Sequence, residues 1–289
     1  MLYPGLYEQV INNALNRELA EIPEARKSTA PIDTAEAAKV LAQYLTDVVQ
    51  KGLENVQDNG GGIEAQIQLA NQIVTTIQNT TQEADFAALG VDQRAEQLLA
   101  LLQQNDPRLA TGKSAKDLDR PETSIAQSSL FTGAIHEPQM YTELKKEIVS
   151  ADRIDMLVSF IKWSGLRLIM GELRQFVQSG GELRIITTSY MGATDVKAIE
   201  ELRTLPNTKI KVSYDTKRTR LHAKTYVFYR DTGFTTAYVG SSNLSNAAIS
   251  SGLEWNVKVT RKDLPETIEK IAATFESYWN SSAVSYTHL

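Results

Sequence analysis

The sequence predicts an α/β fold, a layered sheet with flanking helices, in its second half, preceded by a mainly α-helical region. Between residues 138 and 214, short apolar segments typical of buried strands alternate with helical segments, which predicts parallel crossovers. Before residue 105, apolar residues recur at steps of three and four, as they do on one face of a helix. Hydrophobic residues make up 42% of the 289 residues and charged residues 22%, so the chain can bury a core.

The first region is expected to consist of helices and to serve as a packing or adaptor layer. We expect helices at 4–19, from Asp33 with a capping box to Glu36, from 63 to 77, and from Asp92 through the leucines at 98–102. No strand is expected between 63 and 104. Residues 1–104 are therefore interpreted as a helical N-terminal region. Residues 105–133, rich in Pro, Gly, Ser, Thr and Asp, are interpreted as a linker.

The second region, residues 134–280, carries the expected sheet. Helices are expected at 140–150, 166–178, 195–205 and 264–279, and strands at 153–160, 182–187, 209–214, 222–230, 235–240 and 253–260. Asp231 to Phe234 reads as the turn of a hairpin. Residues 281–289 do not continue the helical pattern and are similar to a translated sequencing adapter, so we interpret them as a non-native tail.

Composition excludes several classes of function. The formal net charge of −5 excludes a histone-like coat for nucleic acid, although a local basic patch can still bind DNA. The absence of cysteine excludes disulfides, thiolate zinc sites and Cys nucleophiles. The histidines are His136, His222 and His288, too few for a His-rich metal site. No apolar run approaches the roughly 20 residues of a membrane span. We expect a soluble, cytoplasmic protein that contacts no membrane and needs no metal or cofactor.

One group of residues carries the predicted chemistry. His222 and Lys224 are two apart on an expected strand, so both side chains should project from one face. An imidazole can attack phosphorus while an ammonium neutralises the phosphoryl oxygens. The turn Gly240-Ser241-Ser242-Asn243 ends the next strand, and Glu254 follows on a third, where a carboxylate can fix a histidine tautomer. On its own, a His-x-Lys pair is usually only the polar face of a strand, and Gly-Ser-Ser-Asn is usually only a turn. Their combination in this order favours a catalytic site.

His-x-Lys, Gly-Ser-x-Asn and a following Glu resemble the signature of the phospholipase D superfamily. The sequence segments around these motifs resemble, more specifically, the phospholipase D-like nuclease domain found before bacterial DEAD/DEAH-type helicases. This resemblance covers roughly Leu130 to Trp279. The matching segments are 159–161, 164–165, 190–195 and 252–256. The resemblance implies that His222 is the nucleophile and Lys224 the phosphate binder. It makes Ser241 and Asn243 supporting groups and Glu254 the residue that orients the histidine. One position departs from the family pattern, because Tyr229 stands where the family usually has Asp.

The resemblance also implies partners and a mechanism. Superfamily catalysis uses two His-Lys pairs and this chain has one, so a two-fold homodimer would complete the site. We expect metal-independent cleavage of DNA through a phosphohistidine. A basic run could line the cleft mouth, or could be a solvated surface; it comprises Lys209, Lys211, Lys217, Arg218 and Arg220. The resemblance implies that helicase motor domains follow in a longer protein; the 289 residues themselves hold no Walker A or DEAD-type motif. The alternative is a non-catalytic dimerisation and DNA-binding module of a helicase.

Overall fold

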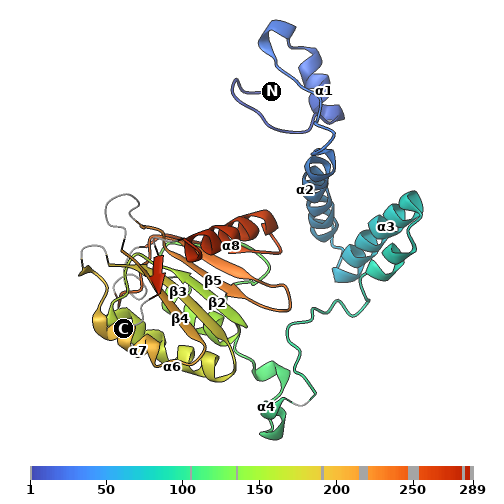
Figure 1. Cartoon of the computed structure of the whole chain (residues 1–289). Coiled ribbons are helices and arrows are strands. Elements are labelled where there is room, and N and C mark those ends of the chain that lie inside the picture. Colours follow the sequence, from blue (N-terminus) through green and yellow to red (C-terminus); the bar gives the residue numbers. More distant parts are fainter. Residues whose placement is uncertain are drawn as a thin grey trace. The chain divides into compact units, whose positions relative to one another are not determined.

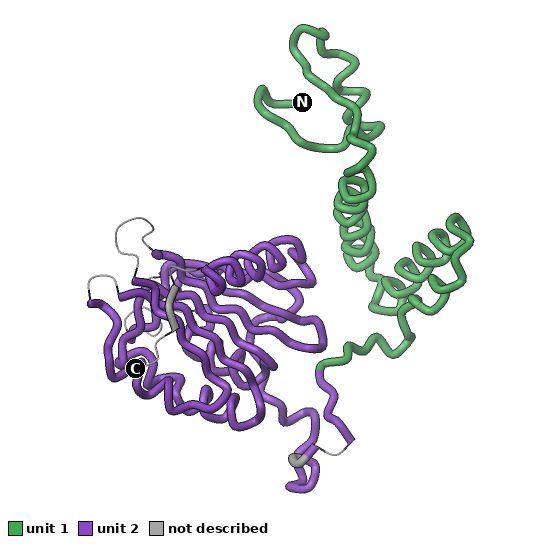
Figure 2. The backbone as a smooth tube through the Cα atoms, in the orientation of Figure 1, with its two compact units in different colours: residues 1–99 green, residues 100–289 purple. Residues whose placement is uncertain are grey.

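The structure is a computed structural model that describes residues 2–104, 106–134, 136–189, 192–214, 221–246, 254–281 and 284–286. The chain divides into two compact units, residues 1–99 and 100–289, which Figure 2 colours separately. No helix in the described ranges is long and apolar enough to cross a lipid bilayer.

The first unit is helical, as the sequence predicts. It contains α1 (Asn13–Ala20), α2 (Ala37–Asp58) and α3 (Ile63–Thr81), with 3-10 turns at Glu24–Arg26 and Ala84–Leu89. The glycines between α2 and α3 are required by the backbone. Gly60 has a φ of +82°, and a Cβ on Gly61 would lie 2.7 Å from the carbonyl oxygen of Val56. The amide of Gln66 donates to the carbonyl of Leu53, which ties the two helices together.

Three expectations for this unit were wrong in detail. The first helix begins at Asn13, where Asn12 caps it through the N–H of Leu15, and not at Pro4. The expected capping box does not form, because Asp33 accepts from the N–H of Ala35 in a local turn and α2 begins later. Local side-chain bonds of this kind compete with helix initiation.

The helix expected after Asp92 is also absent, since residues 91–104 are described without one. Asp92 accepts hydrogen bonds from the backbone and side chain of Arg94 instead. Leu98 and Leu101 are 83% and 82% exposed, so the apolar stripe has no surface to pack against. Short helices gain most of their stability from such packing, and here it is missing.

The second unit is built on one eight-stranded sheet with the order β1-β7-β6-β5-β2-β3-β4-β8. The strands are β1 (Ser129–Phe131), β2 (Arg153–Leu157), β3 (Glu182–Thr188), β4 (Thr208–Ser213), β5 (Thr225–Tyr229), β6 (Thr236–Gly240), β7 (Asn256–Thr260) and β8 (Val284–Tyr286). β2, β3 and β4 are parallel, and every other pairing is antiparallel. β5 and β6 form the expected hairpin, with Gly233 at a φ of +83° in its turn.

Helices cover both faces of this sheet, and the layers are visible in Figure 1. One face packs against α5 (Met140–Val149), α6 (Trp163–Gln178) and α7 (Val196–Arg203). The other packs against α8 (Pro265–Trp279). Before the sheet the chain forms the short α4 (Pro107–Ala110) and a 3-10 turn at Ala115–Asp117.

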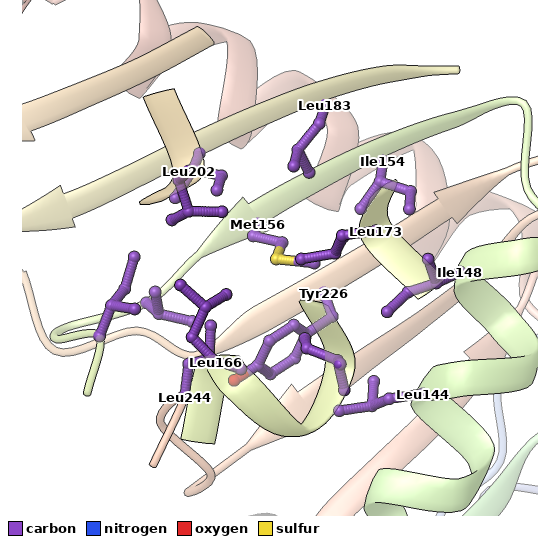
Figure 3. Close-up of a cluster of buried hydrophobic side chains, with 14 of the residues drawn as sticks. Leu144, Ile148, Ile154, Met156, Leu166, Leu173, Leu183, Leu202, Tyr226 and Leu244 are labelled. Atoms are coloured by element: carbon purple, nitrogen blue, oxygen red, sulfur yellow. The ribbon is translucent and has the colours of Figure 1, made fainter. Parts of the chain in front are cut away.

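The main core lies between the sheet and α5, α6 and α7. Figure 3 shows Tyr226 of β5 among aliphatic side chains of α5 and α6, with Met156 of β2 close by. Tyr226 is 1% exposed, and its hydroxyl donates to the carbonyl of Ser242. The core therefore reaches up to the turn that carries the predicted site.

Two strands arise where none was expected. β1 lies within the range interpreted as a linker, and β8 within the range interpreted as a tail. β1 pairs with β7 and β8 pairs with β4, so each adds an outer strand. Three-residue strands carry too short a pattern to be recognised from sequence.

Candidate functional site

The predicted site residues lie at one end of the sheet. The antiparallel hairpin brings the start of β5 beside the end of β6, and β7 begins beside the end of β6. β2 ends beside the start of β5, where Leu157 pairs with Thr225. The segments carrying His222, Asn243 and Glu254 therefore meet at this edge, which we call the site end of the sheet.

His222 and Lys224 contact each other directly. The ammonium of Lys224 lies 2.9 Å from Nδ1 and 3.1 Å from Nε2 of His222, and it donates to the His222 carbonyl at 2.7 Å. Both residues precede β5, whereas the sequence placed them on the strand. The imidazole is exposed while Lys224 is only 5% exposed. The pair thus presents an accessible imidazole backed by an enclosed ammonium.

Glu254 acts on Lys224 through charge. Burial lowers the pKa of Lys224, and the negative charge of Glu254 partly opposes this by favouring the ammonium. Burial, together with the charge of Glu254, also raises the pKa of the Tyr226 hydroxyl. Among the described residues no hydrogen bond joins Glu254 to His222, so the orienting role implied by the resemblance stays a prediction.

The turn from Gly240 to Asn243 is held by its neighbours on every side. The N–H of Ser241 donates to the carbonyl of Trp255 at 3.1 Å, and the N–H of Trp255 donates to the hydroxyl of Ser241 at 3.2 Å. Asn256 donates to the Ser242 hydroxyl at 2.8 Å. A Cβ on Gly240 would lie 2.2 Å from the carbonyl oxygen of Trp255, so this close approach requires glycine.

Asn243 connects the turn to the segment after β2. Its side-chain oxygen accepts from the N–H of Phe160 at 3.3 Å, and Leu244 forms a parallel bridge with Ile161. The start of α6 packs tightly on the residues that follow Asn243, because a Cβ on Gly165 would come within 2.6 Å of the backbone of Ser245. Asn243 therefore fixes the backbone at the site end.

Asp195 holds the opening turn of α6. Its carboxylate accepts from the N–H of Trp163 at 2.8 Å and pairs with Lys162 at 3.1 Å. The hydrogen bond from Trp163 and then that from Lys162 lower the pKa of this carboxyl. The sequence placed Asp195 at the start of the next helix, where it does stand, but its side chain caps α6.

A buried ionic group supports the strands that carry the site. Glu147 of α5 accepts from Arg230 at 2.6 Å, from Lys258 at 2.9 Å and from the Tyr238 hydroxyl at 3.0 Å. Burial opposes the charge of Glu147, but Arg230 and Lys258 outweigh it and hold the pKa of the carboxyl below its ordinary value. This network joins α5 to β6, β7 and the end of β5, and no spacing in the sequence indicated it.

The basic run divides across the sheet. Lys209 pairs with Glu182, the first residue of β3, at 3.1 Å. Lys209 therefore lies near the start of β4, at the end of the sheet that is away from His222. The ammonium of Lys211 donates to the carbonyl of Trp279 and lies 4.6 Å from the centre of the indole. Lys217, Arg218 and Arg220 lie outside the described residues.

Tyr229, the departure from the family pattern, lies at the far end of β5 from Lys224. It pairs in register with Arg153 at the start of β2, and the Arg153 guanidinium lies 3.8 Å from the centre of its ring. Burial, together with the charge of Asp155, raises its pKa to about 12. The side chain that replaces the family's Asp thus belongs to the opposite end of the sheet.

Two residues at the site end fall in segments that carry the family resemblance, 159–161 and 252–256, but the sequence assigned neither of them a role. Ser159 follows β2, is 7% exposed, and its hydroxyl has no hydrogen-bond partner in the described part of the chain. Trp255, between Glu254 and Asn256, is 64% exposed although it is the bulkiest residue type. An unpaired hydroxyl leaves no sequence signal, whereas a Trp next to a predicted site residue was a signal that could have been followed.

Sequence comparison finds one family that matches the part of the chain carrying the sheet. Residues 144–279 match the family described as cardiolipin synthase, PLD-like domain. This part of the chain is therefore similar to a phospholipase D-like domain. No curated protein was found to match the chain.

Several solved structures resemble a part of the chain. NucT from Helicobacter pylori is 22% identical, with 52% of this chain and 94% of NucT covered and a TM-score of 0.41. Nuc, a phospholipase D family member from Salmonella typhimurium, is 23% identical, with 53% and 95% covered and a TM-score of 0.41. Yeast tyrosyl-DNA phosphodiesterase is 13% identical, with 46% and 31% covered and a TM-score of 0.31.

Proposed function

We propose that the phospholipase D-like domain is a phosphodiesterase that cleaves DNA through a phosphohistidine on His222 without a metal ion. The observation that carries the proposal is the contact of 2.9 Å between the Lys224 ammonium and the exposed imidazole of His222. The ammonium supplies positive charge to the phosphoryl oxygens where negative charge grows in the transition state. Glu254 supports that role, because its charge favours the protonated form of Lys224.

The proposed reaction needs two imidazoles. A ring nitrogen of His222 attacks phosphorus, and the bond from phosphorus to the leaving oxygen breaks as that oxygen takes a proton from an imidazolium. A water molecule then attacks phosphorus and gives its proton to the now neutral second imidazole, while the bond to His222 breaks. The chain offers one His-Lys pair, so the second imidazole would be His222 of the partner subunit in a homodimer.

One surface of the sheet suits such a dimer. Val257 pairs with Val239 on one side and with Leu130 on the other, so the three side chains form a row on the face that α8 covers. They are 44%, 38% and 46% exposed, respectively, and we call them the apolar row. The row continues into a hollow of about 280 Å³ between the sheet and α8, which Ala223 also lines. This face also carries Ala223, the residue between His222 and Lys224, so a second copy seated there would lie next to the segment that holds both.

Tyr229 does not weigh against activity, because its side chain is at the opposite end of β5 from Lys224. We extend the proposal to a helicase-linked protein on the strength of the sequence resemblance, with the domain cutting DNA that the helicase exposes. Domain linkage can be tested by sequencing the complete gene, where motor motifs should follow the domain.

The catalytic proposal is tested with purified protein, labelled DNA and bis(p-nitrophenyl) phosphate, all in EDTA. Cleavage should persist in EDTA and should disappear in His222→Ala. The matched control is His136→Ala, which removes an exposed imidazole outside the site and should keep full activity. Activity that requires added magnesium, or that survives in His222→Ala, would contradict the proposal. DNA binding by a dimer without any cleavage would favour the non-catalytic module.

A further inference from the structure

The first unit has almost no core of its own. Residues 2–99 are all described, and among them Ile67 on α3 is the one buried residue. The helices α2 and α3 are nevertheless 22 and 19 residues long. Helices in proteins owe most of their stability to the packing of an apolar face, and an apolar face left in water marks a surface to which another molecule binds. The uncovered faces of α2 and α3 therefore indicate where a partner docks.

One side of α2 is apolar and exposed. Leu41, Leu45 and Val48 follow one another at steps of four and three, which places them on one side of the helix. They are 43%, 53% and 45% exposed, respectively, and we call them the apolar face of α2. Charged residues with the same spacing lie on another side of this helix: Asp47, Lys51, Glu54 and Asp58. α2 is therefore amphipathic, and the first unit leaves its apolar face exposed.

The apolar face of α2 lies on the side of the helix that meets α3 near their shared turn. Four residues after Val48 comes Gly52, where an added Cβ would lie 3.6 Å from the side chain of Leu69 on α3. Close by, Gln66 of α3 donates to the carbonyl of Leu53. Figure 1 shows the two helices diverging from this turn. The side of α2 that α3 covers near the turn is therefore left uncovered farther from it.

The ends of α2 and α3 that lie away from this turn are acidic. Exposed carboxylates precede the first residue of α2 and follow the last residue of α3: Asp33, Glu36, Glu83 and Asp85. Residues 1–99 together hold 14 acidic and 6 basic residues, a formal net charge of −8. Like charges of this size oppose pairing with an identical unit and attract a basic one. The charge therefore favours a basic partner over a second copy of this chain.

We propose that the apolar face of α2 is the docking site for a basic amphipathic helix of a partner protein. The apolar side of that helix would pack against Leu41, Leu45 and Val48, and its Lys and Arg side chains would face the acidic ends of α2 and α3. Recognition between amphipathic helices depends on side chains at steps of three and four, the spacing that α2 presents. This docking site belongs to the first unit and does not depend on the phosphodiesterase activity proposed for the second.

The charge of the partner is tested with two labelled amphipathic peptides of about 18 residues, or five helical turns. One consists of leucine and lysine, and the other has the same leucines with glutamate in place of lysine. Fluorescence anisotropy with the whole chain should show about tenfold tighter binding of the lysine peptide, weakening as salt screens the attraction. Equal binding of the two peptides would contradict a basic partner.

Variants on α2 separate the apolar contact from charge alone. Leu45→Glu adds a carboxylate but interrupts the apolar face, so it should weaken binding of the lysine peptide about tenfold. Leu41→Glu, one turn earlier on the same face, should have the same effect. The matched control is Gln43→Glu, which adds the same charge on the opposite side of α2 and should bind at least as tightly as the wild type. Circular dichroism checks that the helices are kept.

Two results would overturn the docking site. The first is equal binding of the lysine peptide by Leu45→Glu, Leu41→Glu and Gln43→Glu, because charge alone would then explain it. The second is conversion of a dimer to a monomer by Leu45→Glu, measured by light scattering, because the apolar face of α2 would then contact a second copy of this chain.

Discussion

The ammonium of Lys224 lies 2.9 Å from Nδ1 of His222 and also donates to the carbonyl of the same residue at 2.7 Å. The lysine is therefore held against the backbone that carries the imidazole. Because Lys224 is nearly inaccessible, its charge is desolvated, and a phosphoryl group at His222 would feel it strongly. These contacts are the basis for proposing that the two side chains act as one functional unit.

Replacing Lys224 by Ala should abolish most of the catalysis. Removing a single group that stabilises transition-state charge typically costs about 100- to 1,000-fold in kcat, and we expect a loss of that size. Lys262→Ala is the matched control, because this cation lies over Phe234, near the hairpin turn at the other end of the sheet. Initial rates with bis(p-nitrophenyl) phosphate give the comparison, and circular dichroism checks the fold. Equal rates for the two variants would remove Lys224 from the site.

The buried carboxylate of Glu147 should make stability depend on pH. Its folded pKa is below the ordinary value, so its stabilising contribution is present above the unfolded pKa and is lost as pH falls through the folded pKa. Glu147→Gln should cost about 3–5 kcal/mol in the free energy of unfolding at pH 7, because Arg230 and Lys258 lose their counter-charge. The difference between variant and wild type should shrink as pH falls below about 4.

Urea unfolding at pH 7 and in acid measures both effects. The control is Glu201→Gln, which breaks an exposed pair with Arg174 and should cost less than about 1 kcal/mol. A pH-independent difference for Glu147→Gln would show that the carboxylate's charge is not what the cluster needs.

A charge in the apolar row should separate the proposed dimer. Val257→Glu places a carboxylate in the centre of the row without disturbing the core, since this side chain is already 44% exposed. Light scattering should report a monomer, and cleavage should be lost because each site would lack its second imidazole. Ile77→Glu on α3, at 40% exposure, is the matched control and should leave mass and activity unchanged. A Val257→Glu dimer with full activity would exclude this face as the contact.

Restoring the family residue at position 229 should not increase activity. Tyr229 is far from Lys224 along β5 and stacks with Arg153, so Tyr229→Asp would remove that stack and place a carboxylate near Asp155. We expect unchanged cleavage and a lower free energy of unfolding, by about 1–3 kcal/mol. Tyr229→Phe keeps the ring over Arg153 and should be close to neutral. A marked gain of activity in Tyr229→Asp would show that this position communicates with the site.

Much of the fold followed from pattern alone. The alternation of strands and helices after residue 138 predicted the parallel crossovers of β2, β3 and β4, and the turn at Asp231 to Phe234 predicted the hairpin. The apolar stripe of leucines at 98–102 led to the wrong prediction of a helix. Periodicity shows that a helix could bury one face, but it does not show that a partner surface exists. The outer strand β1 is too short to leave a periodic signal.

The meeting of the candidate segments could be predicted, but not their contacts, and the catalytic roles of the residues stay a prediction. Spacing brought His222, Lys224 and Asn243 to one sheet end, which the pairing of β5 with β6 explains. It could not indicate that Asn243 would bind the N–H of Phe160, 83 residues earlier, because that contact depends on how β2 ends beside β5. Nor could it place Asp195 on the start of α6, since a cap from another segment leaves no local motif.

Gly240→Ala should damage the site without removing any polar group. The new Cβ would lie 2.2 Å from the carbonyl oxygen of Trp255 and 2.5 Å from the side-chain oxygen of Asn256, so the backbones of β6 and β7 would have to separate. That shift would move Ser241 and Trp255, which are joined by hydrogen bonds, and we expect a loss of about 1–3 kcal/mol in stability together with most of the activity. Gly171→Ala is the matched control, because nothing lies within 4 Å of its Cβ position on α6. A glycine inside a helix costs about 0.5–1 kcal/mol relative to alanine, so this control should be more stable than the wild type and equally active. Thermal unfolding and cleavage rates of the two variants then separate the effect of the close approach at Gly240 from the general effect of adding a methyl group. Wild-type activity in Gly240→Ala would mean that the turn tolerates displacement.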